Sequence, residues 1–118
     1  MSVIQDLQTR KNECKRLLER YPERVPVIIK RASNCSLNVT AKSKYLVPCN
    51  ITVGQFVFVL RKALTLKCDE TIFIFVKPKS SNAMVLPAAS TLLSQLWKEN
   101  ASEDGFLNIT YHSENAFG

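Results

Sequence analysis

The residues with the greatest chemical reactivity are four cysteines and one histidine. The cysteines are Cys14, Cys35, Cys49 and Cys68, and His112 is the only histidine among the 118 residues. No two cysteines form a C-x-x-C pair, so their spacing disfavours both a zinc ribbon and a thioredoxin-type redox site. With one histidine, no phosphate-binding loop and no paired acid/base site, the sequence predicts a protein that is not an enzyme and that holds no metal or cofactor.

The chain closes on the polar run YHSENAFG, which ends at Gly118. Neither a helix nor a strand requires these residues. The end of a chain is usually poorly ordered and without a special role. Taken alone, the tail therefore leaves open whether its last glycine matters.

Length and composition indicate one globular domain. The 118 residues are 46% hydrophobic and 22% charged, as in ordinary folded proteins. No apolar run reaches transmembrane length, and the start MSVIQDLQTRKNECKR lacks the apolar core of a signal peptide. We therefore expect a cytoplasmic protein whose cysteines are reduced thiols.

The net charge of +6 is concentrated in the first half of the chain. Residues 1–62 hold 12 of the 16 Lys and Arg residues but 4 of the 10 acidic residues. Such a surface could meet nucleic acid, anionic lipid or an acidic peptide, or it could be a solvated helix face. No nucleic-acid-binding motif accompanies the charge, so we predict no nucleic-acid partner.

Periodicity and turn residues predict three helices and four strands. Apolar residues at helical spacing predict a helix over 2–21, which Pro22 ends. A T-x-x-Q capping box, Thr52 to Gln55, opens a second helix. Pro26 marks its strand as an edge strand or a strand start, because proline cannot donate to a ladder. The remaining predicted elements are strands at 25–31, 44–49, 71–77 and 106–111 and helices at about 53–64 and 91–99.

The order of these elements predicts an α+β fold of the β-grasp type, a four-stranded mixed sheet with a crossover helix. Both faces of the strand at 71–77 are apolar, so both must be covered. The helix at 53–64 covers one face and the N-terminal helix the other. We expect an N-terminal helical extension at 1–22, the β-grasp domain at 23–112 and a flexible tail at 113–118.

Two stretches resemble the GABARAP and light-chain-three family of ubiquitin-like autophagy modifiers. They are YPERVPVII at 21–29 and KYLVPCNITVGQFVFVLRK at 44–62, and the Phe-Gly end belongs to the same pattern. The run YLVP-x-x-x-TVGQF is long and ordered, and the resemblance covers nearly the whole chain. It implies a ubiquitin-like β-grasp with added N-terminal helices.

The resemblance also assigns a role to the tail. In this family an activating and a conjugating enzyme pass the terminal glycine along as a thioester, and its carboxylate is joined to the amine of phosphatidylethanolamine. A cysteine protease processes or delipidates the same end. The resemblance implies that Gly118 is the reactive residue and that Phe117 presents it. Glycine suits such chemistry because a residue without Cβ can thread a narrow channel at any φ. The lipidated form would lie on the autophagosome membrane.

A second implied site is a groove that binds aromatic-x-x-aliphatic motifs of cargo receptors by adding a strand to the sheet. The implied aromatic pocket consists of Glu13, Leu17, Pro26, Ile28, Lys44, Leu46 and Phe106. The implied aliphatic pocket consists of Tyr45, Val47, Pro48, Ile51, Phe56 and Val59. The residues implied to meet acidic positions of the motif are Arg24, Lys42 and Lys44.

Alternatives stand beside these assignments. Ile28, Leu46 and Phe56 are equally typical of a hydrophobic core, and Lys42 and Lys44 are typical of a solvated edge strand. The chain could also be a β-grasp adaptor that binds peptides without being conjugated. The sequence departs from the family at Gly105, where an aromatic residue is usual, and this predicts a looser rim of the aromatic pocket.

Overall fold

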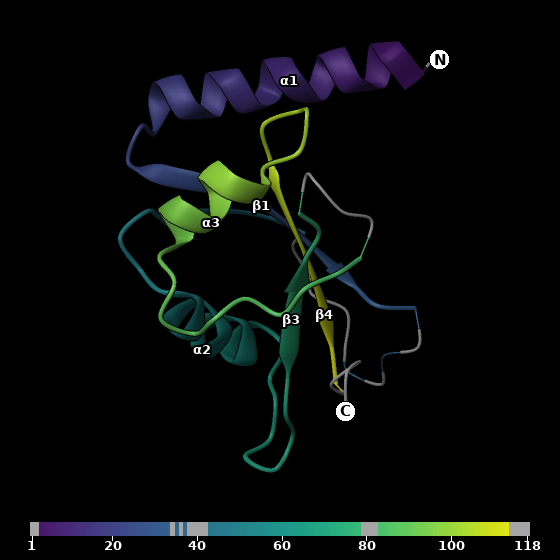
Figure 1. Ribbon diagram of the computed structural model, residues 1–118, viewed down its shortest axis with the longest axis vertical. Coiled ribbons are helices and arrows are strands. Elements are labelled where there is room, and N and C mark those ends of the chain that lie inside the picture. Colours follow the sequence, from purple (N-terminus) through teal and green to yellow (C-terminus); the bar gives the residue numbers. More distant parts are fainter. Residues whose placement is uncertain (1–2, 34, 36, 38–42, 79–82, 114–118) are drawn as a thin grey trace.

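A computed structural model describes residues 3–33, 35, 37, 43–78 and 83–113. Lys42, Phe117 and Gly118 lie outside the described residues, as does the expected tail apart from Ser113. Within the described residues, three helices and four strands follow one another (Figure 1): α1 (Val3–Arg20), β1 (Arg24–Arg31), β2 (Lys44–Pro48), α2 (Val53–Ala63), β3 (Phe73–Val76), α3 (Leu93–Asn100) and β4 (Leu107–His112).

The strands form one mixed sheet in the order β2-β1-β4-β3. The two central strands, β1 and β4, run parallel to each other, and each pairs antiparallel with an edge strand. Two strands, a crossover helix and two further strands reproduce the β-grasp order. The predicted four-stranded mixed sheet is therefore confirmed.

The position of Pro26 differs from the expectation of an edge strand or strand start. Pro26 is the third residue of β1, an inner strand that pairs with both β2 and β4. The Ile29 N–H donates to the Ser43 carbonyl on the β2 side, so by alternation the Pro26 nitrogen faces β4. Pairing with β4 begins only at Val27, opposite Leu107. The missing N–H therefore costs no ladder hydrogen bond.

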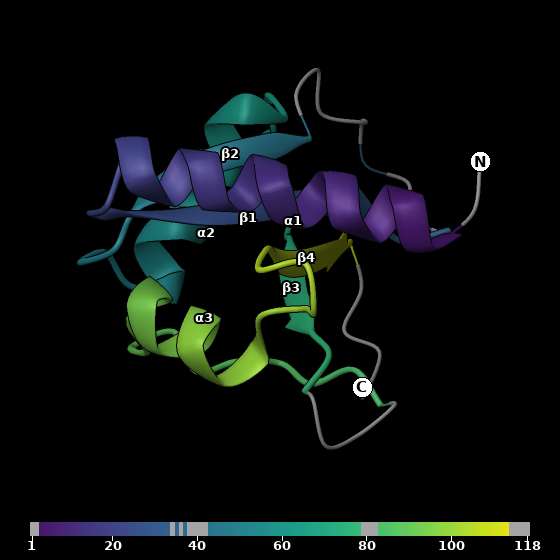
Figure 2. The same cartoon turned by 90° about the horizontal axis from the view of Figure 1, so that it is seen from above.

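Helices cover the sheet on both faces. Figure 2 shows α1 lying across one face, with α2 and α3 on the other. The α2–α3 side holds the main hydrophobic core, to which β1 contributes Val25, Val27 and Ile29 and β4 contributes Leu107, Ile109 and Tyr111. Because side chains alternate along a strand, the residues between them face α1. The predicted cover by the N-terminal helix is confirmed.

Local signals explain where elements begin and end. The capping box forms as predicted: Gln55 N–H donates to Thr52 Oγ1 at 3.2 Å, and Thr52 N–H donates to Gln55 Oε1 at 2.8 Å. The strand predicted at 71–77 is shorter, Phe73–Val76, because its ladder with β4 spans only those four residues. Ile74 and Val76 enter the main core, whereas Phe75 is buried outside it, as the predicted alternation requires.

Candidate functional site

A hollow of about 490 Å³ lies on the α1 face of the sheet, beside the edge strand β2. The hollow lies between side chains of α1 and the part of the sheet that β1 and β2 form. Its lining residues are Glu13 and Leu17 from α1, Tyr21 directly after that helix, Arg24 from β1, Lys44, Tyr45 and Leu46 from β2, and Phe106 just before β4.

The periodicities of the helix and the strand bring these side chains together. Glu13, Leu17 and Tyr21 recur every four residues and so form one stripe along α1 and its end. On β2, Lys44 and Leu46 stand two residues apart and therefore share the α1 face. Across the ladder they lie opposite Ile28 and Pro26. The hollow is thus bounded by a helix stripe and one face of an edge strand.

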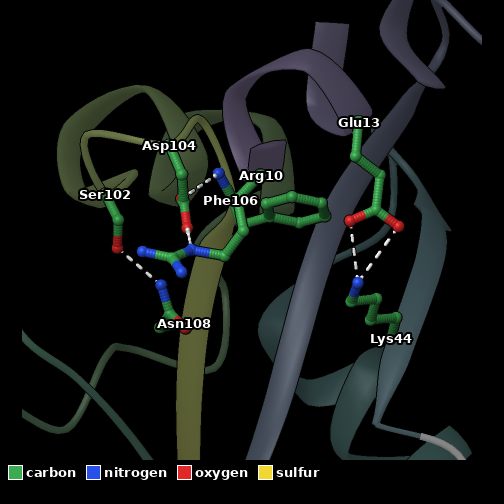
Figure 3. Close-up of polar contacts among 7 residues, drawn as sticks. All are labelled: Arg10, Glu13, Lys44, Ser102, Asp104, Phe106 and Asn108. Atoms are coloured by element: carbon green, nitrogen blue, oxygen red, sulfur yellow. Dashed lines mark hydrogen bonds and ion pairs between the residues drawn. The ribbon is translucent and has the colours of Figure 1, made fainter. Parts of the chain in front are cut away.

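An ion pair spans the hollow. Lys44 Nζ donates to both carboxylate oxygens of Glu13, at 2.7 and 3.0 Å (Figure 3). The same ammonium group lies 5.7 Å from the centre of the Phe106 ring, within the range of a cation–π contact. Both side chains of this ion pair are partly exposed, so Lys44 can exchange Glu13 for an acidic group of a ligand at a modest cost in free energy. A cation beside an aromatic ring suits a ligand that has both a ring and an acidic group.

Arg24 also lines this hollow. Its Nη1 donates to the Leu46 carbonyl at 3.2 Å. The Ser43 carbonyl points toward β1, and the carbonyls of successive residues in a strand point alternately to its two sides. The Leu46 carbonyl, three residues later, therefore points to the open edge of β2. A guanidinium group is therefore already held at the backbone edge where an added strand would pair.

The structure brings most of the implied aromatic pocket together. Glu13, Leu17, Lys44, Leu46 and Phe106 line the hollow. Pro26 and Ile28 lie on the same face of the sheet but do not line the hollow, and Pro26 is fully buried.

Sequence reasoning missed Tyr21, although it stands one helical turn beyond Leu17 on the same stripe. Tyr45, which the resemblance assigns to the aliphatic pocket, contributes to the lining of the hollow and also packs against the main core on the other face of the sheet. The four-residue spacing of this stripe could have identified Tyr21.

The implied aliphatic pocket lies on the other side of β2, toward α2. Val47 and Phe56 are buried members of the main core, and Tyr45 and Ile51 pack against that core. Val59 is 46% exposed and Pro48 is also exposed. The surface that a ligand could touch here is therefore formed by Pro48, Val59 and the accessible part of Ile51.

The four cysteines differ in their exposure to solvent. All four are free thiols, and Cys14 and Cys35 are buried. Burial raises the pKa of the Cys14 thiol above its ordinary value, and the negative charges of Asp104 and Glu13 raise it further. Among the described residues, no three Cys, His, Asp or Glu side chains gather as metal ligands. In the same part of the chain, no helix is long and apolar enough to cross a membrane.

Comparison with known proteins gives the family. The family model described as "Autophagy protein Atg8 ubiquitin like" matches residues 9–118. The chain belongs to the Atg8 family. Autophagy-related protein 8c of Arabidopsis thaliana is 45% identical over 112 residues, which cover 95% of this chain and 89% of the relative. Autophagy-related protein 8 of Schizosaccharomyces pombe is 44% identical over 111 residues, covering 94% and 87%.

Solved structures of Atg8 proteins share the fold. The crystal structure of Trypanosoma brucei ATG8 superimposes with a TM-score of 0.81 at 30% identity and covers 95% of this chain and 91% of that one. Plasmodium falciparum Atg8, solved with a Plasmodium falciparum Atg3 peptide, gives a TM-score of 0.80 at 31% identity and covers 98% of both chains. The predicted kinship with ubiquitin-like autophagy modifiers is confirmed, and lipid conjugation is the known role of Atg8 proteins.

Proposed function

We propose that this Atg8-family chain is joined through the Gly118 carboxylate to phosphatidylethanolamine on autophagosomal membranes, with Phe117 presenting the glycine. It then recruits cargo receptors through the edge of β2. In this role the chain is a substrate and afterwards a tag, so it needs no catalytic group and no cofactor of its own. Its two acyl chains would anchor it firmly, because one chain alone gives only marginal binding to a membrane.

The partners follow from this chemistry. An activating enzyme, a conjugating enzyme and a cysteine protease would act on the Gly118 end. The peptide bound to Plasmodium falciparum Atg8 comes from Atg3, which supports a conjugating enzyme among the partners of this chain. The lipidated form would lie on the autophagosome membrane and the free form in the cytoplasm.

The observation that carries the groove proposal is the place of β2 in the sheet. β2 is an edge strand, so one side of its backbone is available to an added strand. The hollow of about 490 Å³ lies on one face of this edge, and exposed Val59 and Pro48 lie toward the other. Residues three apart in an extended peptide point to opposite faces. An aromatic-x-x-aliphatic motif would therefore send one anchor to each side of β2.

Charge on the α1 side suits a motif preceded by acidic residues. Lys44 and Arg24 both line the hollow, and each is held by an exposed contact that an acidic peptide could replace. Lys42, which lies outside the described residues, is the third cation that the family resemblance implies for this role. Charge-assisted hydrogen bonds of this kind strengthen binding and fix the orientation of the peptide.

Mass spectrometry of the C-terminal tryptic peptide, residues 99–118, tests the conjugation. The peptide is taken from the membrane fraction of starved source cells. We expect it to carry phosphatidylethanolamine on Gly118, and we expect a Gly118→Ala variant to lose both the modified peptide and the membrane association. A membrane-fraction peptide with a free Gly118 carboxylate would instead support the adaptor that uses only the groove.

A further inference from the structure

The loop between α3 and β4, residues 101–106, is tied into a fixed shape. Trp97 Nε1 donates to the Gly105 carbonyl at 2.7 Å, and the Ser102 N–H donates to the Phe106 carbonyl at 2.8 Å. The Asn108 side-chain amide donates to Ser102 Oγ at 2.5 Å. Phe106, the last residue of this loop, lines the hollow. The shape of the loop therefore determines where the Phe106 ring lies.

Asp104 joins this loop to α1. Its carboxylate is 7% exposed and accepts two hydrogen bonds, from the Phe106 backbone N–H at 2.9 Å and from Arg10 Nε at 3.0 Å (Figure 3). A buried carboxylate is tolerated only where such donors replace water. The Asp104 side chain therefore binds both the backbone of Phe106 and helix α1, and both of these line the hollow.

Gly105 allows the helix to come this close. Its φ is +93°, and a Cβ at this position would lie 2.7 Å from the Sγ of Cys14 on α1. A side chain here would push the helix away or move the loop. The hydrogen bonds of Asp104 therefore join α1 and the loop at a point where Gly105 and Cys14 are already in close contact.

Two ion pairs flank the Phe106 ring. Arg10 and Glu13 stand one turn apart on α1 and so share a face of the helix. Arg10 binds Asp104 on one side, and Glu13 binds Lys44 on the other, with the ring between them in Figure 3. The ring is 1% exposed, although it lies outside the main core. Its position therefore depends on α1 and on the loop.

We propose that Asp104 is a positioning residue for the aromatic half of the groove. Through Arg10 and the Phe106 N–H it sets the separation between α1 and the Phe106 ring, and thereby the fit of an aromatic anchor. The aliphatic half, formed on α2 and the far face of β2, does not depend on it. This inference rests on the proposed peptide-binding function and names a residue outside the predicted pockets.

The chain offers matched controls for this claim. Next to Arg10 and Asp104, Lys11 and Glu103 form a second pair between the same helix and the same loop, but at 3.8 Å and with Glu103 74% exposed. Asp104→Asn and Glu103→Gln remove the same charge at neighbouring positions, and Arg10→Gln and Lys11→Gln do the same on α1. Differences within each pair therefore report the contact and not the net charge.

The test compares two synthetic peptides that contain no acidic residues. One carries an aromatic-x-x-aliphatic core, and the other has alanine in place of its aromatic residue. We expect Asp104→Asn and Arg10→Gln to weaken the first peptide by about tenfold and to leave the second within about twofold, as loss of one buried charged hydrogen bond would do. Arg10→Lys, which keeps a cation, should retain more affinity than Arg10→Gln. Equal weakening of both peptides, or equal effects of Asp104→Asn and Glu103→Gln, would overturn the proposal.

A second measurement separates this claim from the proposed function. Hydrogen exchange of the Phe106 amide should be faster in Asp104→Ala, which removes the acceptor oxygen, than in Glu103→Ala, while the Trp97 indole resonance shows that the loop is otherwise intact. If the unaltered protein binds neither peptide, the groove function fails, and the exchange rates still judge the positioning role. Unchanged Phe106 exchange in Asp104→Ala would refute that role.

Discussion

At the scale of single residues, Lys44 contacts both a charged and an aromatic side chain of the hollow. It pairs with Glu13 and lies over the Phe106 ring, so it already makes within the chain the two contacts that a ligand would supply. The Lys44 side chain is 50% exposed, which keeps its exchange of partners inexpensive. We therefore expect Lys44 to contribute more to the proposed recognition of peptides than to stability.

Replacing Lys44 by glutamine should weaken binding of a peptide with acids before its aromatic residue by about tenfold, because one charge-assisted contact is lost. The free energy of unfolding should change by less than about 1 kcal/mol, because the ion pair is exposed. Calorimetric titration and urea unfolding measure the two quantities. Lys67→Gln, at an exposed position away from the hollow, is the control and should leave both unchanged.

Cys14 predicts a pH dependence of a definite sign. Burial, then Asp104 and Glu13, raise its pKa in the folded protein above the ordinary 9.0. The folded state thus keeps the thiol proton when the unfolded state has begun to lose it. The stabilisation is fully present below pH 9.0 and is lost as the pH rises through the higher folded pKa.

Urea unfolding of the unaltered protein and of Cys14→Ala, measured from neutral pH to well above pH 9.0, checks this sign. The stability difference between the two should be constant up to about that pH and should then shrink. A difference that grows with rising pH would show that the thiol ionises more readily in the folded state.

At the scale of elements, the docking of α1 on the α3–β4 loop depends on Gly105. Gly105→Ala should lower the free energy of unfolding by about 2 kcal/mol, since a Cβ is strained at φ +93° and would lie 2.7 Å from Cys14 Sγ. Adding Cys14→Ala should recover the part of this loss that comes from the clash. Thermal or urea unfolding measures both.

Gly54 is the matched control for this substitution. It lies in α2 without a positive φ, and an added Cβ would meet its nearest neighbour, the Ala89 carbonyl, at 3.4 Å. Gly54→Ala should be neutral or slightly stabilising, because alanine favours a helix over glycine. If the two substitutions cost the same, Gly105 would not be the close contact that holds α1.

Particular elements show how far the sequence could predict this structure. Helical spacing and period-two alternation identified all seven elements, and the capping box placed the start of α2. Apolar residue type alone could not tell that Val47 and Phe56 belong to the core while Val59 stays exposed, because all three are apolar. The Arg10–Asp104 pair joins residues 94 positions apart, so no local pattern could reveal it.

At the scale of the whole molecule, the sheet lies between two layers of helices, and its edge strand β2 borders a different surface on each side. α1 covers one face of the sheet, and α2 and α3 cover the other (Figure 2). β2 lies at the edge of the sheet, where both layers end in accessible side chains. The β-grasp with its added helix therefore places the hollow on one side of β2 and the exposed Pro48 and Val59 on the other.

The most direct test of this arrangement is the affinity of peptides that differ only in the spacing of their two anchors. Isothermal titration would compare aromatic-x-aliphatic, aromatic-x-x-aliphatic and aromatic-x-x-x-aliphatic peptides of equal length and charge. Only the middle spacing sends the anchors to opposite faces of an added strand, so it should bind tighter than both others by about tenfold or more. Equal affinity at all three spacings would contradict capture at the β2 edge.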